Sequence, residues 1–243
     1  MSGEGEGEGA RVQVYFYGDY VCPFSYVEDA RVREVVRGED DVDLHWRPLP
    51  IHPAVPSDGL PADELGYAPD EWSRIRREVR EQAEAAGVPL EMPDFVANSR
   101  GALQAAEFAK DVAPEAFRRV HRALFQAFFV DGRNLGETAV LLDVCEGAGL
   151  DRQALETALE DDRYAEELSI AEREASRYGI EGTPTLLFGR HKVVGAAPSD
   201  VLRDALDRAG RDAASGGPDA AGEGAAPPGD EVASGEGSAG DGS

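Results

Sequence analysis

The hydrophobic positions in the first fifty residues follow two different periods. The run VQVYFY (12–17) reads as a buried strand. In VDLHWR (42–47), Val, Leu and Trp alternate with Asp, His and Arg, which is the period of a strand with one buried face. Between them the apolar residues from Val27 to Val35 follow helical spacing, and Gly38 marks the end of the helix. This order predicts a βαβ unit with two parallel strands.

The middle of the chain, from Asp70 to Tyr178, follows helical spacing throughout. Glycines and helix-capping residues divide it into segments, and Pro114 stands where a first-turn proline is expected. The predicted helices are DEWSRIRREVREQAEAAG (70–87), NSRGALQAAEFAKD (98–111), PEAFRRVHRALFQAFF (114–129), ETAVLLDVCEGAG (137–149), DRQALETALEDD (151–162) and AEELSIAEREASRYG (165–179).

Two short apolar runs then predict a hairpin. TPTLLFG (183–189) and HKVVG (191–195) flank Gly189-Arg190, and PSDVLRDALDRAG (198–210) follows as a last helix that ends at Gly210. The order β-α-β, helices, β-β-α predicts an α/β fold. Its two halves, residues 11–56 and 166–210, form one domain, and residues 57–165 form an inserted helical domain.

The amino-acid composition indicates that both chain termini and the surface of the folded part are acidic. Residues 1–10 and 211–243 are rich in Gly, Ala, Ser and acidic residues, so we expect two disordered acidic tails. The formal net charge is −24, and only Lys110 and Lys192 are lysines. The acidic excess is not confined to the tails, and it indicates a salt-loving source. It also disfavours nucleic acid, whose phosphates such a surface repels.

The sequence shows neither a long apolar run nor the basic and apolar parts of a signal peptide, so we expect no membrane association. It has only two cysteines, Cys22 and Cys145, and they are far apart in the sequence, so they cannot form a disulfide framework. A reducing cytoplasm is therefore the expected compartment.

Cys22 stands at the turn between the first strand and the first helix, in the spacing C-x-x-S with Ser25. At a helix N-terminus, unpaired N–H groups and the helix dipole favour an anion, so we expect a lowered Cys22 pKa and a partly ionised thiol. Pro23 suits the first helical position, and Ser25 is placed to donate a hydrogen bond back to the sulfur.

The motifs CPFSY, after VYFYGDYV, and GIEGTPTLLFG near the other end resemble the DsbA-like branch of the thioredoxin superfamily. They resemble most closely its cytoplasmic FrnE-type group, which has a CPWCY-like motif. ANSRGALQAAEFAKD, FFVDGRNLG and AGLD resemble parts of that group's helical insertion. The resemblance implies a thioredoxin-like fold (βαβ…ββα) with a large α-helical insertion, and Thr183-Pro184 matches a cis-proline loop packed against the active cysteine. It implies catalytic roles for Cys22, Ser25 and Pro184, and substrate contacts for Pro23, Phe24, Tyr26 and Thr183.

Ser25 stands where the family usually has a second cysteine. Because Ser25 cannot attack a mixed disulfide on Cys22, an external thiol has to resolve that intermediate. We therefore expect a cytoplasmic protein disulfide oxidoreductase that exchanges disulfides through Cys22 alone. Its partners are proteins or small molecules that carry thiols or disulfides, and it needs no cofactor beyond a low-molecular-weight thiol as co-substrate. Cys145 shares an apolar helical face and is predicted to be structural, and the four histidines show no metal-site spacing.

Two other functions remain open. Kappa-type glutathione transferases and 2-hydroxychromene-2-carboxylate isomerases have a SPYSY-like motif, in which a serine activates a bound thiol cofactor, and Phe24-Ser25-Tyr26 matches it. A redox-silent peptide-binding module is the other alternative, since the second cysteine is missing. The physiological substrate, the direction of the redox reaction and the oligomeric state are left open.

Overall fold

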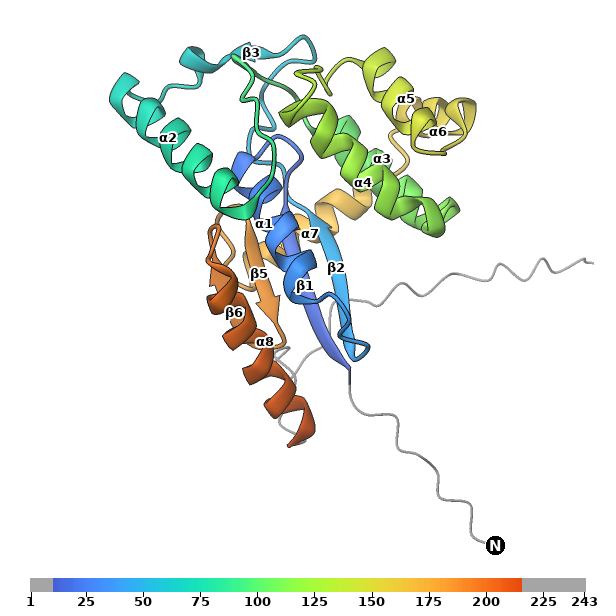
Figure 1. Cartoon of the computed structure of the whole chain (residues 1–243). Coiled ribbons are helices and arrows are strands. Elements are labelled where there is room, and N and C mark those ends of the chain that lie inside the picture. The colour runs from blue at the N-terminus through green and yellow to red at the C-terminus, as the bar shows by residue number, and fades with distance from the viewer. Residues whose placement is uncertain (1–10, 216–243) are drawn as a thin grey trace, which may run out of the picture.

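The computed structural model describes residues 11–215 and contains a mixed sheet with helices on both of its faces (Figure 1). The strand order is β2-β1-β5-β6. β1 (Val12–Gly18) pairs in parallel with β2 (Val42–Pro48), and β5 (Thr185–Phe188) and β6 (His191–Val194) form an antiparallel hairpin beside β1. The predicted βαβ unit and hairpin are therefore confirmed.

Alternate residues of β1 face the two sides of the sheet. Val14 and Phe16 belong to the large apolar core that also contains residues of α1 (Pro23–Val35) and α8 (Ser199–Ala214). Tyr17 packs with Ala175 of α7 (Ala165–Arg177) in a second cluster. Strand alternation thus places α1 and α8 on one face and α7 on the other, the arrangement visible in Figure 1.

The inserted segment lies beyond one end of the sheet (Figure 1). Its helices are α2 (Pro69–Ala86), α3 (Arg100–Val112), α4 (Pro114–Phe129), α5 (Thr138–Gly147) and α6 (Arg152–Glu160). Before α2 a short 3-10 helix, η1 (Ala62–Glu64), follows the strand β3 (Leu60–Pro61), and β3 pairs with β4 (Phe95–Val96), which lies between α2 and α3. The helical insertion is confirmed. The two-residue strands were missed because they are too short to show a period.

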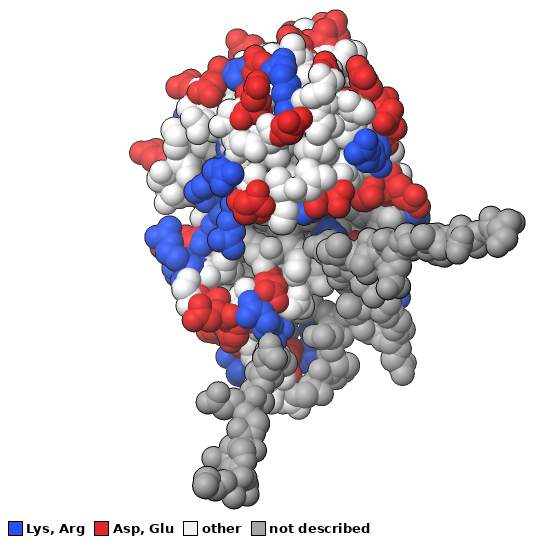
Figure 2. All heavy atoms as spheres, turned by 90° about the vertical axis from the view of Figure 1, so that its right-hand side faces the viewer, with Lys and Arg blue, Asp and Glu red and all other residues white. Residues whose placement is uncertain are grey.

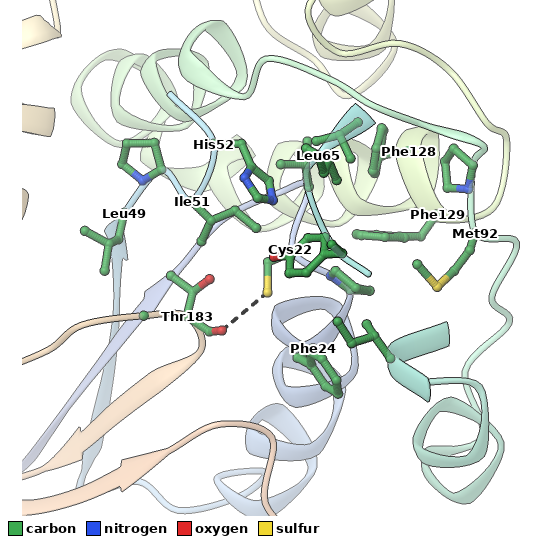
Figure 3. Close-up of a pocket in the computed structure, with 18 of the residues that line it drawn as sticks. Cys22, Phe24, Leu49, Ile51, His52, Leu65, Met92, Phe128, Phe129 and Thr183 are labelled. Atoms are coloured by element: carbon green, nitrogen blue, oxygen red, sulfur yellow. Dashed lines mark hydrogen bonds between the residues drawn. The ribbon is translucent and has the colours of Figure 1, made fainter. Parts of the chain in front are cut away.

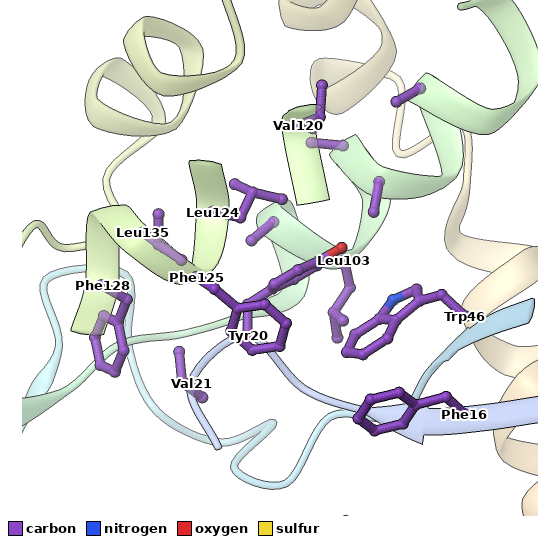
Figure 4. Packing of buried hydrophobic residues seen from close by; sticks show 14 of the residues in the cluster. Phe16, Tyr20, Val21, Trp46, Leu103, Val120, Leu124, Phe125, Phe128 and Leu135 are labelled. Atoms are coloured by element: carbon purple, nitrogen blue, oxygen red, sulfur yellow. The ribbon is translucent and has the colours of Figure 1, made fainter. Parts of the chain in front are cut away.

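One apolar core joins the insertion to the sheet. Figure 4 shows Tyr20 between Trp46 of β2 and Phe125 of α4. The Tyr20 ring centroid lies 5.0 Å from that of Trp46 and 4.9 Å from that of Phe125. Buried polar groups add to this contact. The Tyr20 hydroxyl lies 2.8 Å from Nδ1 of His121, whose Nε2 lies 3.0 Å from Asp29 of α1. Because the core and the polar chain both cross the boundary, the insertion holds a defined position over the residues that precede α1.

The C-terminal helix extends further than predicted. α8 continues through Gly210 to Ala214, so the boundary between the last helix and the C-terminal tail at residue 210 is wrong. Asp212 explains the extension, because its carboxylate pairs with Arg190 and His191 of the β5–β6 hairpin at 2.8 Å each. These contacts offset the cost of a glycine inside a helix. The predicted tail at residues 1–10, and residues 216–243 of the tail predicted at 211–243, lie outside the described residues.

Candidate active site

Cys22 is the residue immediately before α1, at the point where the chain turns from β1 into the helix. Its backbone N–H donates to the carbonyl of Asp19 at 3.1 Å, and its own carbonyl accepts from Tyr26 at 3.2 Å. Pro23 occupies the first helical turn, where no N–H donor is required. The local sequence therefore places the sulfur at the N-terminus of α1, as predicted.

Thr183 lies against this sulfur although it is far away in the sequence. The Cys22 thiol donates to the Thr183 carbonyl at 3.5 Å, which Figure 3 shows as a dashed line. The Thr183-Pro184 peptide bond is cis, and Pro184 is buried directly before β5. The pairing of β1 with β5 brings the two segments together, because both loops leave the same end of the sheet.

The electrostatics of Cys22 differ from the expectation. The side chain is only 3% exposed, and burial raises the pKa of the thiol above its ordinary value. Hydrogen bonds from the Ser25 side chain and backbone act in the opposite direction but do not outweigh burial. The prediction of a lowered pKa is therefore wrong: the helix N-terminus is present, but tertiary packing removes the water that would stabilise a thiolate. In the resting protein the sulfur is a thiol.

Asp19 is a buried carboxylate next to this turn, and sequence reasoning missed it. It accepts hydrogen bonds from the Ile51 N–H at 2.8 Å, the Val21 N–H at 3.2 Å and the Ser99 hydroxyl at 2.9 Å. Burial nonetheless raises the pKa of Asp19 to about 6. Asp19 thus connects three segments that surround Cys22, and its charge raises the pKa of the thiol. A lone aspartate after a strand gave no signal for this role.

Ser25 is fully buried behind the cysteine. Its hydroxyl oxygen accepts from the Asp19 N–H at 3.4 Å, and its hydrogen bonds to Cys22 lower the pKa of the thiol. The expected contact between Ser25 and the sulfur is therefore present. The structure places this hydroxyl where a second cysteine of a C-x-x-C motif would stand.

Cys22 borders a pocket of about 410 Å³ between the sheet and the insertion (Figure 3). Pro23, Phe24 and Thr183, which are expected to contact the substrate, also line it. Most of the wall is apolar and comes from the loop after β2, α2, the segment around β4, and α4; its larger side chains are Ile51, Leu65, Tyr67, Trp72, Ile75, Met92, Phe95, Phe128 and Phe129. These residues are distant in the sequence, so only the tertiary fold identifies them as neighbours of the sulfur.

A family model for the DSBA-like thioredoxin domain matches residues 13–207. The chain belongs to this family. The match covers both halves of the sheet and the whole insertion, which is the extent that the sequence motifs indicated. Members of the DSBA-like family are thiol–disulfide oxidoreductases in general, so the family and the geometry around Cys22 point to the same chemistry.

One relative and two solved structures are similar to most of the chain. The uncharacterized protein YwbO of Bacillus subtilis is 29% identical over 203 residues, which are 80% of this chain and 96% of YwbO. The probable DsbA oxidoreductase SCO1869 of Streptomyces coelicolor is 26% identical with a TM-score of 0.74, over 82% of this chain and 90% of that one. A 2-hydroxychromene-2-carboxylate isomerase is 21% identical with a TM-score of 0.63, over 85% and 100% of the two chains. At that identity the isomerase shows a shared fold alone.

Tyr26 is the one expected substrate-contacting residue that the structure does not place at the pocket wall. Its ring stacks on Phe129 with centroids 5.2 Å apart, and its hydroxyl donates to the carbonyl of Pro89 at 2.9 Å. The side chain therefore packs α1 against α4 and the segment after α2. Its expected role at the substrate is corrected to packing, because the insertion covers the face of α1 on which it lies.

Cys145 lies in α5, is fully buried, and does not line the pocket. Burial raises the pKa of its thiol to about 12. These properties are those of a structural thiol, in agreement with its predicted place on an apolar helical face. Both cysteines of this DSBA-like domain are free.

The surface of the domain carries acidic side chains over a wide area. On the face shown in Figure 2, Asp and Glu are spread among fewer Lys and Arg side chains. Within residues 11–215, no group of three or more His, Cys, Asp or Glu side chains is arranged to hold a metal ion. No described helix is both long enough and apolar enough to cross a membrane.

Proposed function

We propose that this DSBA-like protein is a thiol–disulfide oxidoreductase that works through Cys22 alone. The observation that carries the proposal is the contact of the Cys22 sulfur with Thr183 at the edge of a pocket, with Ser25 behind it instead of a second thiol. The other cysteine, Cys145, is buried in α5 and away from the pocket. A single sulfur is therefore the reacting group.

The reaction has two exchange steps. Cys22 loses its proton and attacks one sulfur of a substrate disulfide, so a Cys22 mixed disulfide forms and the other sulfur leaves as a thiolate that takes up a proton. An external low-molecular-weight thiol then attacks the substrate sulfur of the mixed disulfide, so Cys22 leaves and takes up a proton, and the second half of the substrate departs disulfide-bonded to the external thiol. A second external thiol attacks that disulfide and frees the second substrate thiol, so two external thiols are oxidised to their disulfide and the substrate disulfide is reduced. Pro23, Phe24 and Thr183 line the pocket that the attacked sulfur enters, and Pro184 directly follows Thr183.

The raised pKa of Cys22 favours reduction over oxidation. A strong thiol oxidant stabilises its reduced cysteine as a thiolate, which makes that cysteine a good leaving group. Here burial destabilises the thiolate, so the reduced form of Cys22 gains no such stabilisation from ionisation. A reductant is expected where low-molecular-weight thiols are abundant, so we propose a cytoplasmic location.

Disulfide reduction by matched variants tests the proposal. We expect the wild type to reduce a small disulfide catalytically with cysteamine as the external thiol. Cys22→Ala should lose this activity, and Cys145→Ala should keep it. Thermal unfolding of both variants identifies any loss that is due to misfolding. Activity retained by a folded Cys22→Ala variant would contradict the proposal.

An isomerase or transferase that uses a bound thiol cofactor is the second candidate. The fold shared with the 2-hydroxychromene-2-carboxylate isomerase and the buried Ser25 favour it. In that mechanism the cysteine sulfur is dispensable. Cys22→Ser should then retain or improve turnover of a small aromatic substrate in the presence of a thiol, whereas the oxidoreductase mechanism requires this variant to be inactive.

A further inference from the structure

The pocket beside Cys22 has an unusual charge composition for a site that receives a small thiol compound. Its lining contains neither Lys nor Arg, and its acidic member is Glu181. Within residues 11–215 Glu181 forms no ion pair, and it is exposed two positions before Thr183. The loop that contacts the sulfur through Thr183 therefore also carries an unneutralised carboxylate at the pocket edge.

The remaining polar groups do not supply a positive charge. His52 also lines the pocket, and burial lowers its pKa, so the imidazole is neutral at pH 7. The N-terminus of α1 attracts anions, but the Ser25 N–H there is already directed at the Cys22 sulfur. A carboxylate that entered the pocket would lose water and meet an apolar wall and a like charge.

Size and burial restrict the substrate further. A volume of about 410 Å³ is that of a small-molecule site. Cys22 is 3% exposed, and Figure 3 shows its sulfur among labelled side chains from several segments, with Ile51 and His52 on one side and Phe24 on another. A disulfide therefore has to enter the pocket to reach the sulfur, and a compact molecule does so most readily.

We propose that Cys22 selects small disulfides whose groups near the sulfur are uncharged or cationic, and that Glu181 disfavours anionic ones. This inference rests on the proposed exchange at Cys22 and names its substrate class. It predicts poor reaction with disulfides of anionic thiols, including oxidised glutathione. The Cys22 sulfur forms one new S–S bond, and the leaving thiol carries away the electron pair of the broken bond.

Three matched disulfides test the selection. Cystamine, 2-hydroxyethyl disulfide and 3,3′-dithiodipropionic acid have similar lengths and carry two ammonium groups, two hydroxyl groups and two carboxylates. The rate of Cys22 modification by each is followed by mass spectrometry at about 0.15 M salt, where a nearby carboxylate still acts on the substrate. Each rate is divided by that of 2-mercaptoethanol with the same disulfide. We expect the dicarboxylate to react roughly tenfold more slowly than the hydroxyl compound, and cystamine at least as fast as it.

Two variants assign the effect. Glu181→Gln should reduce the ratio of the normalised rate with cystamine to that with the dicarboxylate roughly threefold. It should leave the normalised rate with the hydroxyl compound unchanged. Glu160→Gln removes the same charge from an exposed position at the end of α6 and should leave all ratios unchanged. Equal normalised rates for all three disulfides, or no effect of Glu181→Gln, would overturn the charge selection while the exchange itself stands. Absence of any reaction at Cys22 in the folded protein would overturn the exchange as well.

Discussion

Replacing Asp19 with asparagine should change how the stability of the protein depends on pH. Asp19 is fully buried, and burial raises its pKa from the usual 3.8 to about 6. The folded state therefore holds this proton more tightly than the unfolded state, and stability falls as pH rises between these two values. Below pH 3.8 both states are protonated and the effect is absent, and above pH 6 it is complete.

The magnitude follows from the displacement of the pKa. A rise from 3.8 to about 6 corresponds to about 3 kcal/mol of unfolding free energy. About 2 kcal/mol of this should be lost between pH 4.5 and pH 7.5, because the unfolded carboxyl is already largely ionised at the lower pH. In Asp19→Asn this contribution is missing, so the variant should lose about 2 kcal/mol less than the wild type over the same interval.

Urea unfolding in concentrated salt at the two pH values measures this difference. Other titrating groups contribute equally to both proteins and cancel. Ser99→Ala is a control that should change the pH dependence of stability in the opposite direction, because the Ser99 hydroxyl donates to Asp19 at 2.9 Å and lowers the pKa of Asp19. Its loss should make the pH dependence steeper. The same pH dependence in the wild type and Asp19→Asn would refute the assignment of a buried, mostly protonated carboxyl at pH 4.5.

Three further predictions concern the motif, a second buried acid and the shared core. Ser25→Cys should yield an internal disulfide with Cys22 after treatment with a small disulfide, seen as a loss of two hydrogens in place of a stable adduct; a persistent adduct would show that the two positions cannot meet. Glu28 is buried, accepts from the Ala197 N–H at 3.1 Å and has its pKa raised to about 7. Urea unfolding should therefore show that Glu28→Gln stabilises the protein by about 2–3 kcal/mol more at pH 8.5 than at pH 5.5. The same effect of the substitution on unfolding free energy at both pH values would contradict the raised pKa. Leu103 of α3 is fully buried in the core that joins the insertion to the sheet. Leu103→Ala should lower the unfolding free energy by about 2–5 kcal/mol, whereas Val201→Ala, at an exposed position, should lower it by under about 1 kcal/mol. Equal losses of unfolding free energy would contradict a shared, close-packed core.

The order of the elements could be predicted from the sequence because each boundary has a local cause. Strand and helix periods separate β1, α1 and β2, and Gly38 and Gly87 take positive φ values of 82° and 67° just after α1 and α2. Cys22 and Thr183 are 161 positions apart in the sequence, and their contact was expected only through the resemblance. The end of α8 was predicted wrongly because it depends on a contact with the hairpin.

The chemistry of the site was less accessible to sequence reasoning. The N-terminus of α1 is a local feature, and it indicated a thiolate at Cys22. Burial is a property of the tertiary structure, and it reverses the direction of the pKa change. The same limit applies to Asp19 and to the pocket wall, whose residues come from segments that no local pattern connects. Local patterns therefore located the reactive sulfur but not its environment.

Peptide mapping of the folded protein after reaction with cystamine tests most directly whether Cys22 is the reacting group. We expect one mixed disulfide per chain, located on Cys22, while Cys145 remains a free thiol until the protein is unfolded with urea. Modification of Cys145 in the folded protein with Cys22 unmodified, or no modification before unfolding, would contradict a sulfur held at an accessible pocket opposite Thr183.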